Sequence, residues 1–186
     1  MLKNIFSLAL IAAILFFING TTSAAENVKV SKVSVIIEPP VESFDKPEIV
    51  YASIEQTVNK IFKNAPNYKL DPIDETAGYV QVYREDNALD AETFLKKSDI
   101  DAICKNIESD FIVYLKISGT APKTFGESIL GAQAKMVLDF RIWANDKKDF
   151  TYTKRVTKTD DYSFEKSLAK GLQEVEKDAA KIRAAM

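Results

Sequence analysis

Apolar residues recur at two spacings along the first half of the chain, and these spacings predict strands alternating with helices. A strand is predicted over 28–37, because the β-branched run Val33–Ile37 is typical of a central strand covered on both faces. A helix is predicted over 50–62, where apolar residues fall on one face at Val50, Ile54, Val58, Ile61 and Phe62. Residues 68–73 then indicate a short second strand.

Two clear period-two patterns follow in the second half. Over 111–119, Phe111, Val113, Leu115 and Ile117 alternate with Ile112, Tyr114 and Lys116, which predicts a strand with two distinct faces. Over 134–144, the predicted core face consists of Ala134, Met136, Leu138, Phe140, Ile142 and Ala144. A hairpin leads to a strand over 149–160. Matching the two apolar sets requires an odd loop, either 145–147 or 145–149, and we favour the latter. This register sets Ile142 opposite Tyr152 and Leu138 opposite Val156.

Two further helices are predicted, and one stretch stays open. Ser98 is expected to cap a helix over 98–108, and Ser163 to cap the longest helix, over 163–185. Close packing is expected at Gly171, beside the apolar stripe of that last helix. Residues 74–97 are ambiguous, because 79–83 alternates like a strand while its acidic flanks also suit a helix.

These elements predict one α/β (α+β) domain over residues 26–186. Its mixed sheet has about five strands, includes a C-terminal β-hairpin and packs against about three helices. The strand order is not determined by the sequence.

The first 25 residues have the three parts of a cleavable export signal. Lys3 gives a positive start, 5–18 is an almost unbroken apolar run, and Ser23, Ala24 and Ala25 supply small residues at the cleavage region. A membrane-spanning helix needs ~20 apolar residues, so this shorter run favours a signal over an uncleaved anchor. We expect a soluble, exported protein without a membrane span after cleavage, located in the periplasm or secreted.

Composition narrows the possible partners and chemistry. The 25 basic and 27 acidic residues are interspersed without a Lys/Arg run, which argues against nucleic acid as a partner. The single cysteine, Cys104, excludes an internal disulfide and lies far from any lipid-attachment position. Because Cys104 shares an apolar register with Ile100 and Ile103, we interpret it as a buried small hydrophobe.

The sequence offers no catalytic constellation. It contains no histidine, which removes Ser-His-Asp and Cys-His catalysis and imidazole metal sites, and no Gly-rich phosphate loop follows a predicted strand. We therefore expect neither a cofactor nor a metal, and not an enzyme. A glycosidase uses two carboxylates, but acids also favour turns and helix starts. Acids cluster at Asp71/Asp74/Glu75, Glu85/Asp86, Asp99/Asp101 and Asp160/Asp161.

The outward face of the C-terminal hairpin carries residue types that are enriched at protein interfaces. A partner-binding surface is hypothesised from Trp143, Arg141, Arg155, Lys135 and Tyr114. Two alternatives stay open: a solvated sheet face rich in threonine, which favours strands, and cover over Trp143 by the C-terminal helix. The loop over 120–133, with Phe125 and Ile129, is a second candidate contact site.

Three segments in order carry a resemblance to known exported domains. They are Lys32–Ile37, Ser109–Gly119, in which the acid Asp110 and the aromatic Phe111 open a strand, and the hairpin strand Leu138–Asp146. With them the chain resembles the α/β domains of the TolB N-terminal, CsgG and LpoB-like type. The resemblance implies a protein-binding module of the cell envelope without catalytic residues. The chain lacks the acylated cysteine of the lipoproteins, so the resemblance does not extend to membrane tethering or pore-type assembly.

We therefore expect a non-catalytic binding or adaptor module whose partner is another envelope protein. Two alternatives are a carboxylate-dependent hydrolase acting on cell-wall or sugar substrates and a carrier of a small apolar ligand. The identity of the partner and the oligomeric state are not determined by the sequence.

Overall fold

A five-stranded mixed sheet forms the centre of the fold in the order β2-β1-β3-β4-β5. The computed structural model describes residues 29–63, 65–120, 134–160 and 163–186. The strands are β1 (Ser31–Glu38), β2 (Tyr68–Leu70), β3 (Phe111–Thr120), β4 (Ala134–Ala144) and β5 (Asp149–Asp160). β1 pairs in parallel with β2 and β3, whereas β3, β4 and β5 are antiparallel. The predicted α+β fold with a C-terminal hairpin is confirmed, but the segment predicted to be an export signal and most of the 120–133 loop lie outside the described residues.

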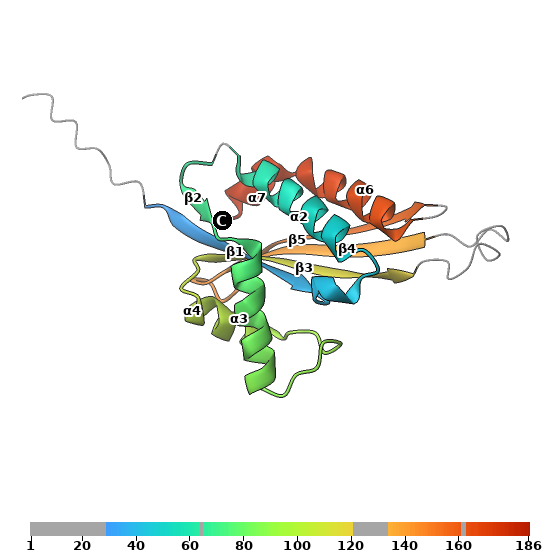
Figure 1. Cartoon of the computed structure of the whole chain (residues 1–186). Coiled ribbons are helices and arrows are strands. Elements are labelled where there is room, and N and C mark those ends of the chain that lie inside the picture. The colour runs from blue at the N-terminus through green and yellow to red at the C-terminus, as the bar shows by residue number, and fades with distance from the viewer. Residues whose placement is uncertain (1–28, 64, 121–133, 161–162) are drawn as a thin grey trace, which may run out of the picture.

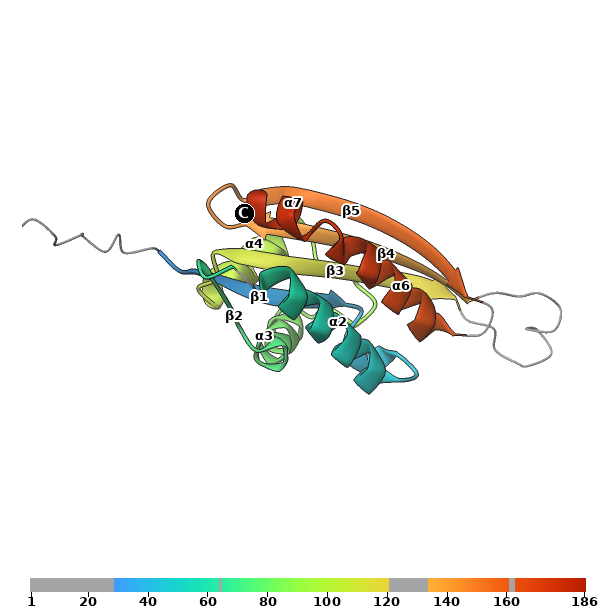
Figure 2. The same cartoon turned by 90° about the horizontal axis from the view of Figure 1, so that it is seen from above.

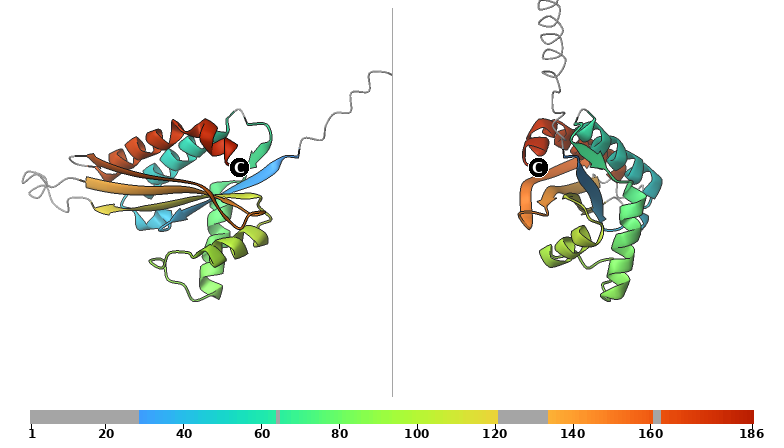
Figure 3. Two further views of the ribbon diagram at one scale, coloured as in Figure 1. Left: turned by 180° about the vertical axis from the view of Figure 1, so that it is seen from behind. Right: turned by 90° about the vertical axis from the view of Figure 1, so that its left-hand side faces the viewer.

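Two layers of helices lie on opposite sides of this sheet (Figure 1; Figure 3). The helices are α2 (Pro47–Phe62), α3 (Ile73–Asp86), α4 (Lys97–Asn106), α6 (Phe164–Glu176) and α7 (Ala179–Ala184), and a 3₁₀ turn, η1 (Val41–Ser43), follows β1. Seen from above, α2 and α6 run beside each other along the sheet (Figure 2). Among the described helices, none is long and apolar enough to span a membrane.

The strand pattern divides the core in two, because neighbouring residues of a strand point to opposite faces. The first face packs on α2, α6 and α7, and the core there includes Phe140 of β4 with Leu168 and Leu172 of α6, all of which are buried. The second face packs on α3 and α4, and the core there includes Ile36 of β1 with Ile103 and Cys104 of α4. The predicted faces of β3 and β4 and the buried state of Cys104 are therefore confirmed. There are more helices than the three predicted.

The ambiguous residues 74–97 form a helix followed by a loop. The buried residues of α3 are Ile73, Thr76, Val80 and Arg84, which recur at helical spacing. Ile73 begins this helix, so β2 is shorter than predicted and ends at Leu70. The capping prediction for Ser98 is wrong, because α4 begins at Lys97 and the Asp99 carboxylate accepts a hydrogen bond from the Lys96 backbone N–H at 2.7 Å.

The C-terminal helix is interrupted, and its 13-residue first part, α6, is shorter than the 16-residue α2. Lys154 Nζ donates to the carbonyl of Glu174 at 2.7 Å, the group that would accept from the Asp178 N–H in a continuous helix. The Asp178 N–H instead donates to the Val175 carbonyl. The predicted cap is confirmed, since Ser163 Oγ accepts from the Lys166 N–H at 3.2 Å. A Cβ added at Gly171 would lie 2.3 Å from Met136 Cε, which confirms close packing there.

The predicted hairpin register is present, although the turn differs from the favoured five-residue loop. Ile142 lies opposite Tyr152 and Leu138 opposite Val156. Trp143 pairs with Phe150 rather than with Thr151, so β5 contains one extra residue between these pairs. The turn spans 145–148, and the extra residue in β5 restores the match that an odd loop would have given.

Candidate functional site

The second face of the sheet is only partly covered by helices. α3 and α4 lie over one end of β3 and β4, and the other ends of these strands extend beyond them (Figure 1; Figure 3). We define the open sheet face by the residues that share this side of the extending ends. They are Ser118 and Thr120 on β3, Lys135, Val137, Asp139 and Arg141 on β4, and Thr153, Arg155, Thr157 and Thr159 on β5.

Charge on the open sheet face is dominated by cations. Asp139 lies opposite Arg155 and is nearly buried, with 8% of its surface exposed. Its two carboxylate oxygens lie 3.5 Å from Arg141 Nη2 and 3.5 Å from Arg155 Nε. The Arg155 side chain is 70% exposed, and Lys135 forms no ion pair with the described residues. Three cations against one carboxylate leave a formal charge of +2 on the face of a chain whose net charge is −2.

Trp143 and Tyr114 do not belong to this accessible surface. They are 1% and 3% exposed and lie in the core cluster under α4, together with Ile103. The C-terminal helix does not cover Trp143, because α6 and α7 pack on the other side of the sheet. Phe150 contacts the Trp143 ring edge-on at 5.4 Å and lies 5.2 Å from the Arg141 guanidinium. The structure thus brings Arg141, Arg155 and Lys135 to one surface, and it places the two aromatic residues on the same side of the sheet but under α4.

A buried ion pair that sequence reasoning missed anchors the loop between α3 and α4. Glu38 is fully buried at the end of β1 and accepts hydrogen bonds from Arg84 Nη2 and from the Tyr114 hydroxyl. The Leu95 N–H donates to the same carboxylate at 3.0 Å, and Arg84 Nη1 donates to two loop carbonyls. Burial, followed by the bond to Glu38, raises the pKa of Tyr114. No local pattern indicates this contact, because Glu38 and Arg84 are 46 residues apart.

The loop between α3 and α4 marks the boundary of the open sheet face. Phe94 is 40% exposed, and Lys116 Nζ lies 3.5 Å from the centre of its ring. This distance is within the range of a cation–π contact. Lys116 is therefore occupied by the loop, whereas the strand residues beyond it remain accessible.

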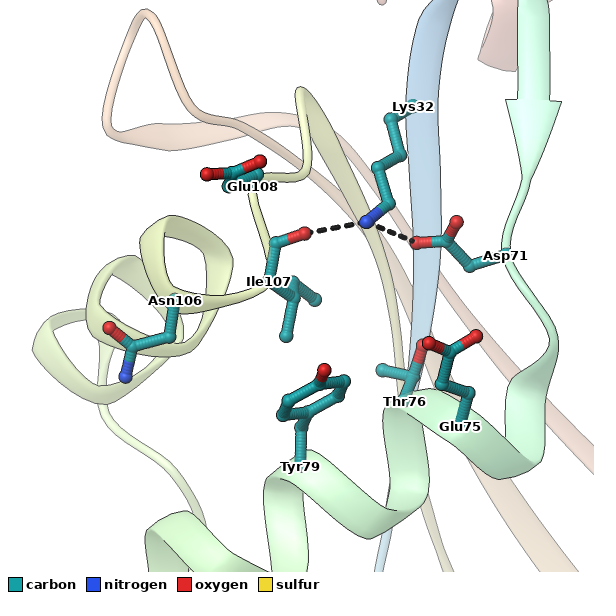
Figure 4. Close-up of a pocket in the computed structure, with 8 residues that line it drawn as sticks. All are labelled: Lys32, Asp71, Glu75, Thr76, Tyr79, Asn106, Ile107 and Glu108. Atoms are coloured by element: carbon teal, nitrogen blue, oxygen red, sulfur yellow. Dashed lines mark hydrogen bonds and ion pairs between the residues drawn. The ribbon is translucent and has the colours of Figure 1, made fainter.

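A polar cleft of about 280 Å³ lies between α3 and α4, at the opposite end of β3 from the open sheet face. Lys32 Nζ lies between two acceptors in this cleft, 2.6 Å from the Ile107 carbonyl oxygen and 3.3 Å from the Asp71 carboxylate (Figure 4). Asp71 also accepts a 2.6 Å hydrogen bond from Ser34 Oγ. The remaining lining residues are Glu75, Thr76, Tyr79, Asn106 and Glu108.

Most of the other clustered acids that the structure describes have structural partners, and Asp161 lies outside the described residues. The Asp99 carboxylate accepts from the Tyr83 hydroxyl at 3.0 Å, and burial together with this bond raises the pKa of Tyr83. Asp101 pairs with Lys105 on the next turn of α4 at 2.6 Å. Glu85 accepts from Gln81 at 2.9 Å. Asp99 lies in the first turn of α4, as the interpretation of these acids as turn or helix-start residues predicts, whereas Asp101 and Glu85 lie further along their helices.

Comparison with known proteins returns matches among solved structures alone. No protein-family profile and no curated protein matches the chain. The C-terminal domain of LpoB from Salmonella enterica aligns with 72% of this chain and 87% of its own, at 12% identity and a TM-score of 0.38. Lipoprotein GNA1162 from Neisseria meningitidis aligns over 81% and 99%, at 11% identity and a TM-score of 0.46. The PelC dodecamer from Paraburkholderia phytofirmans aligns over 81% and 87%, at 8% and 0.44. The expected resemblance to LpoB-type domains is thus confirmed as a distant likeness of fold.

Proposed function

We propose that this chain is an exported, non-catalytic binding module of the cell envelope, and that it docks an acidic surface of another envelope protein on the open sheet face. The observation that carries the proposal is the pairing of two arginines with one nearly buried carboxylate at the centre of a sheet region that no described helix covers. Asp139 orients Arg141 and Arg155 without neutralising both. A partner carboxylate at this position would complete the charge balance.

The chemistry of the surrounding residues supports a protein partner. Arginine presents a planar set of donors that matches a carboxylate, and its guanidinium is weakly hydrated, so it suits interface ion pairs. The exposed threonines of β5, Thr153 and Thr157, flank Arg155 with short hydroxyl side chains. Lys135 extends the positive charge toward the far end of β4. Cationic rims of this kind steer an acidic partner and set the rate of association.

A charge-reversal experiment tests the docking surface. A photo-crosslinking residue at Thr157 should capture one envelope protein in cells, and Lys135→Glu with Arg155→Glu should abolish that crosslink. The affinity of the reconstituted complex should fall as the salt concentration rises, because salt screens the attraction between exposed charges. The Debye length is ~10 Å at 0.1 M salt.

The matched control is Lys63→Glu with Lys166→Glu, which makes the same change in net charge at two exposed lysines outside the open sheet face. Capture should persist in this control. Loss of the crosslink in both double variants, or in neither, would show that the open sheet face is not the docking surface.

Export is tested separately, on the protein recovered from cells. Mass spectrometry of its N-terminus should find a chain that begins after the small residues Ser23, Ala24 and Ala25. Recovery with Met1 still in place would refute the export signal while leaving the docking test intact.

A further inference from the structure

The polar cleft adjoins a second, less polar depression between α3 and α4. The second depression has a volume of about 90 Å³ and shares Tyr79, Asn106 and Ile107 with the polar cleft. It is also lined by Val82, Tyr83, Asp86 and Ile103. Because the two depressions share three lining residues, we call them together the α3–α4 groove, with a polar end at Lys32 and a less polar end at Ile103.

The polar end of the α3–α4 groove carries uncompensated negative charge. Its lining includes three carboxylates and one lysine, which gives a formal charge of −2. Lys32 is occupied by Asp71 and by the Ile107 carbonyl oxygen. Glu75 and Glu108 are exposed and make no ion pair or side-chain hydrogen bond with any residue that the structure describes. The excess charge therefore faces the opening.

An exposed apolar pair lies between the two ends of the α3–α4 groove. Tyr79 is 51% exposed and Val82 is 55% exposed, and they are one helical turn apart on α3. The Tyr79 hydroxyl points toward the space between the two helices, beside the acidic end (Figure 4). An aromatic ring next to free carboxylates provides two attractions for one cation, by charge and by the ring face.

We propose that the α3–α4 groove binds a basic–apolar segment of a partner protein. A lysine or arginine side chain enters the acidic end between Glu75 and Glu108, and the adjoining apolar side chain packs on Tyr79 and Val82. The excess of carboxylates at the polar end favours a basic side chain over a neutral or acidic one.

Nuclear magnetic resonance titration of the purified protein tests this proposal. The probe is the dipeptide N-acetyl-Lys-Leu-amide at up to about 20 mM, a concentration that occupies sites of millimolar Kd. Backbone amide shifts should change in the segments 75–83 and 103–110. The neutral probe N-acetyl-Gln-Leu-amide should bind about fivefold more weakly, because each exposed ion pair contributes only modestly.

Two double variants separate charge at the groove from charge elsewhere. Glu75→Gln with Glu108→Gln should lower the affinity for the lysine probe about fivefold and leave the neutral probe unaffected. Glu55→Gln with Glu92→Gln removes two exposed carboxylates at other places and should change neither. Absence of localised shifts, equal binding of both probes, or equal loss in the two double variants would overturn the proposal. None of these residues belongs to the open sheet face, so either proposal can fail without the other.

Discussion

Removal of Arg84 from its buried ion pair with Glu38 should destabilise the protein far more than removal of the lysine from an exposed ion pair. Arg84→Met leaves the charge of Glu38 in a position that is fully buried. Breaking a buried ion pair in this way costs about 3–5 kcal/mol, and the variant also loses the Arg84 hydrogen bonds to two loop carbonyls. For a protein of this size, a change of that magnitude lowers the melting temperature by roughly 10 °C.

The matched comparison is the exposed pair formed by Lys97 and Asp149. Their charged atoms are 2.5 Å apart, but the side chains are 61% and 57% exposed. Lys97→Met should therefore cost only about 0.2–1 kcal/mol. Trp143, the one tryptophan of the chain, is buried and reports unfolding by its fluorescence. Urea titrations of both variants then give the two free energies of unfolding on one scale.

A second variant tests whether the loss of stability comes from the unpaired, buried charge of Glu38. Glu38→Gln added to Arg84→Met removes the buried charge while an amide oxygen remains to accept from Tyr114 and Leu95. This double variant should be more stable than Arg84→Met alone by about 1 kcal/mol or more. If Arg84→Met costs no more than Lys97→Met, or if the second substitution restores nothing, the buried pair does not anchor the loop between α3 and α4.

Further predictions concern the burial of Cys104, the packing at two glycines and the ionisation of Asp178. Burial raises the pKa of Cys104 to about 12, so Ellman's reagent should react with the native thiol much more slowly than with the urea-unfolded one, and equal rates would contradict the burial. Gly119→Ala should destabilise by about 1–3 kcal/mol, because its Cβ would lie 1.9 Å from the Lys135 carbonyl oxygen. Gly78→Ala should stabilise by about 0.5–1 kcal/mol, because a Cβ there meets nothing within 4 Å; urea midpoints that move in the same direction would refute this contrast. The hydrogen bonds from Lys154 and Tyr152 lower the pKa of Asp178 to about 2, so their stabilisation is present above the ordinary aspartate value of about 3.9 and is lost as pH falls from there toward 2. Asp178→Asn should make the free energy of unfolding depend less on pH in this range. An unchanged slope would contradict the lowered pKa of Asp178.

The strands and helices whose apolar residues follow one clear spacing were predictable from sequence. In β4, all six residues of the predicted core face are fully buried, and the register of the hairpin followed from matching this face to β5. Alternation fixes which residues share a face, and burial fixes which face points inward. The bulge beside Trp143 was not predictable, because a four-residue turn with one extra strand residue gives the same register as a five-residue loop.

Contacts between distant segments were not predictable in the same way. Trp143 and Arg141 share one face of β4, and nothing in the alternation distinguishes a covered position from an open one. α4 covers Trp143 through residues about 40 positions earlier in the chain, including Ile103. The break before α7 also depends on a distant contact, because Lys154 of β5 donates a hydrogen bond to the carbonyl oxygen of Glu174 in α6. Such features depend on tertiary contacts that local propensity does not contain.

The uneven cover of the second sheet face nevertheless has a cause in the composition of its strands. On this side, the buried apolar residues are grouped at one end, at Ile36, Ile112, Tyr114 and Trp143, and these meet the buried isoleucines of α4. Beyond Lys116 and Arg141 the same side carries hydroxyls, charges and one apolar residue, Val137, so a helix placed there would gain little apolar burial and would desolvate several polar groups. The open sheet face therefore remains uncovered within the described fold for an energetic reason. A partner that supplies carboxylates can bind where an apolar helix of the chain itself would not.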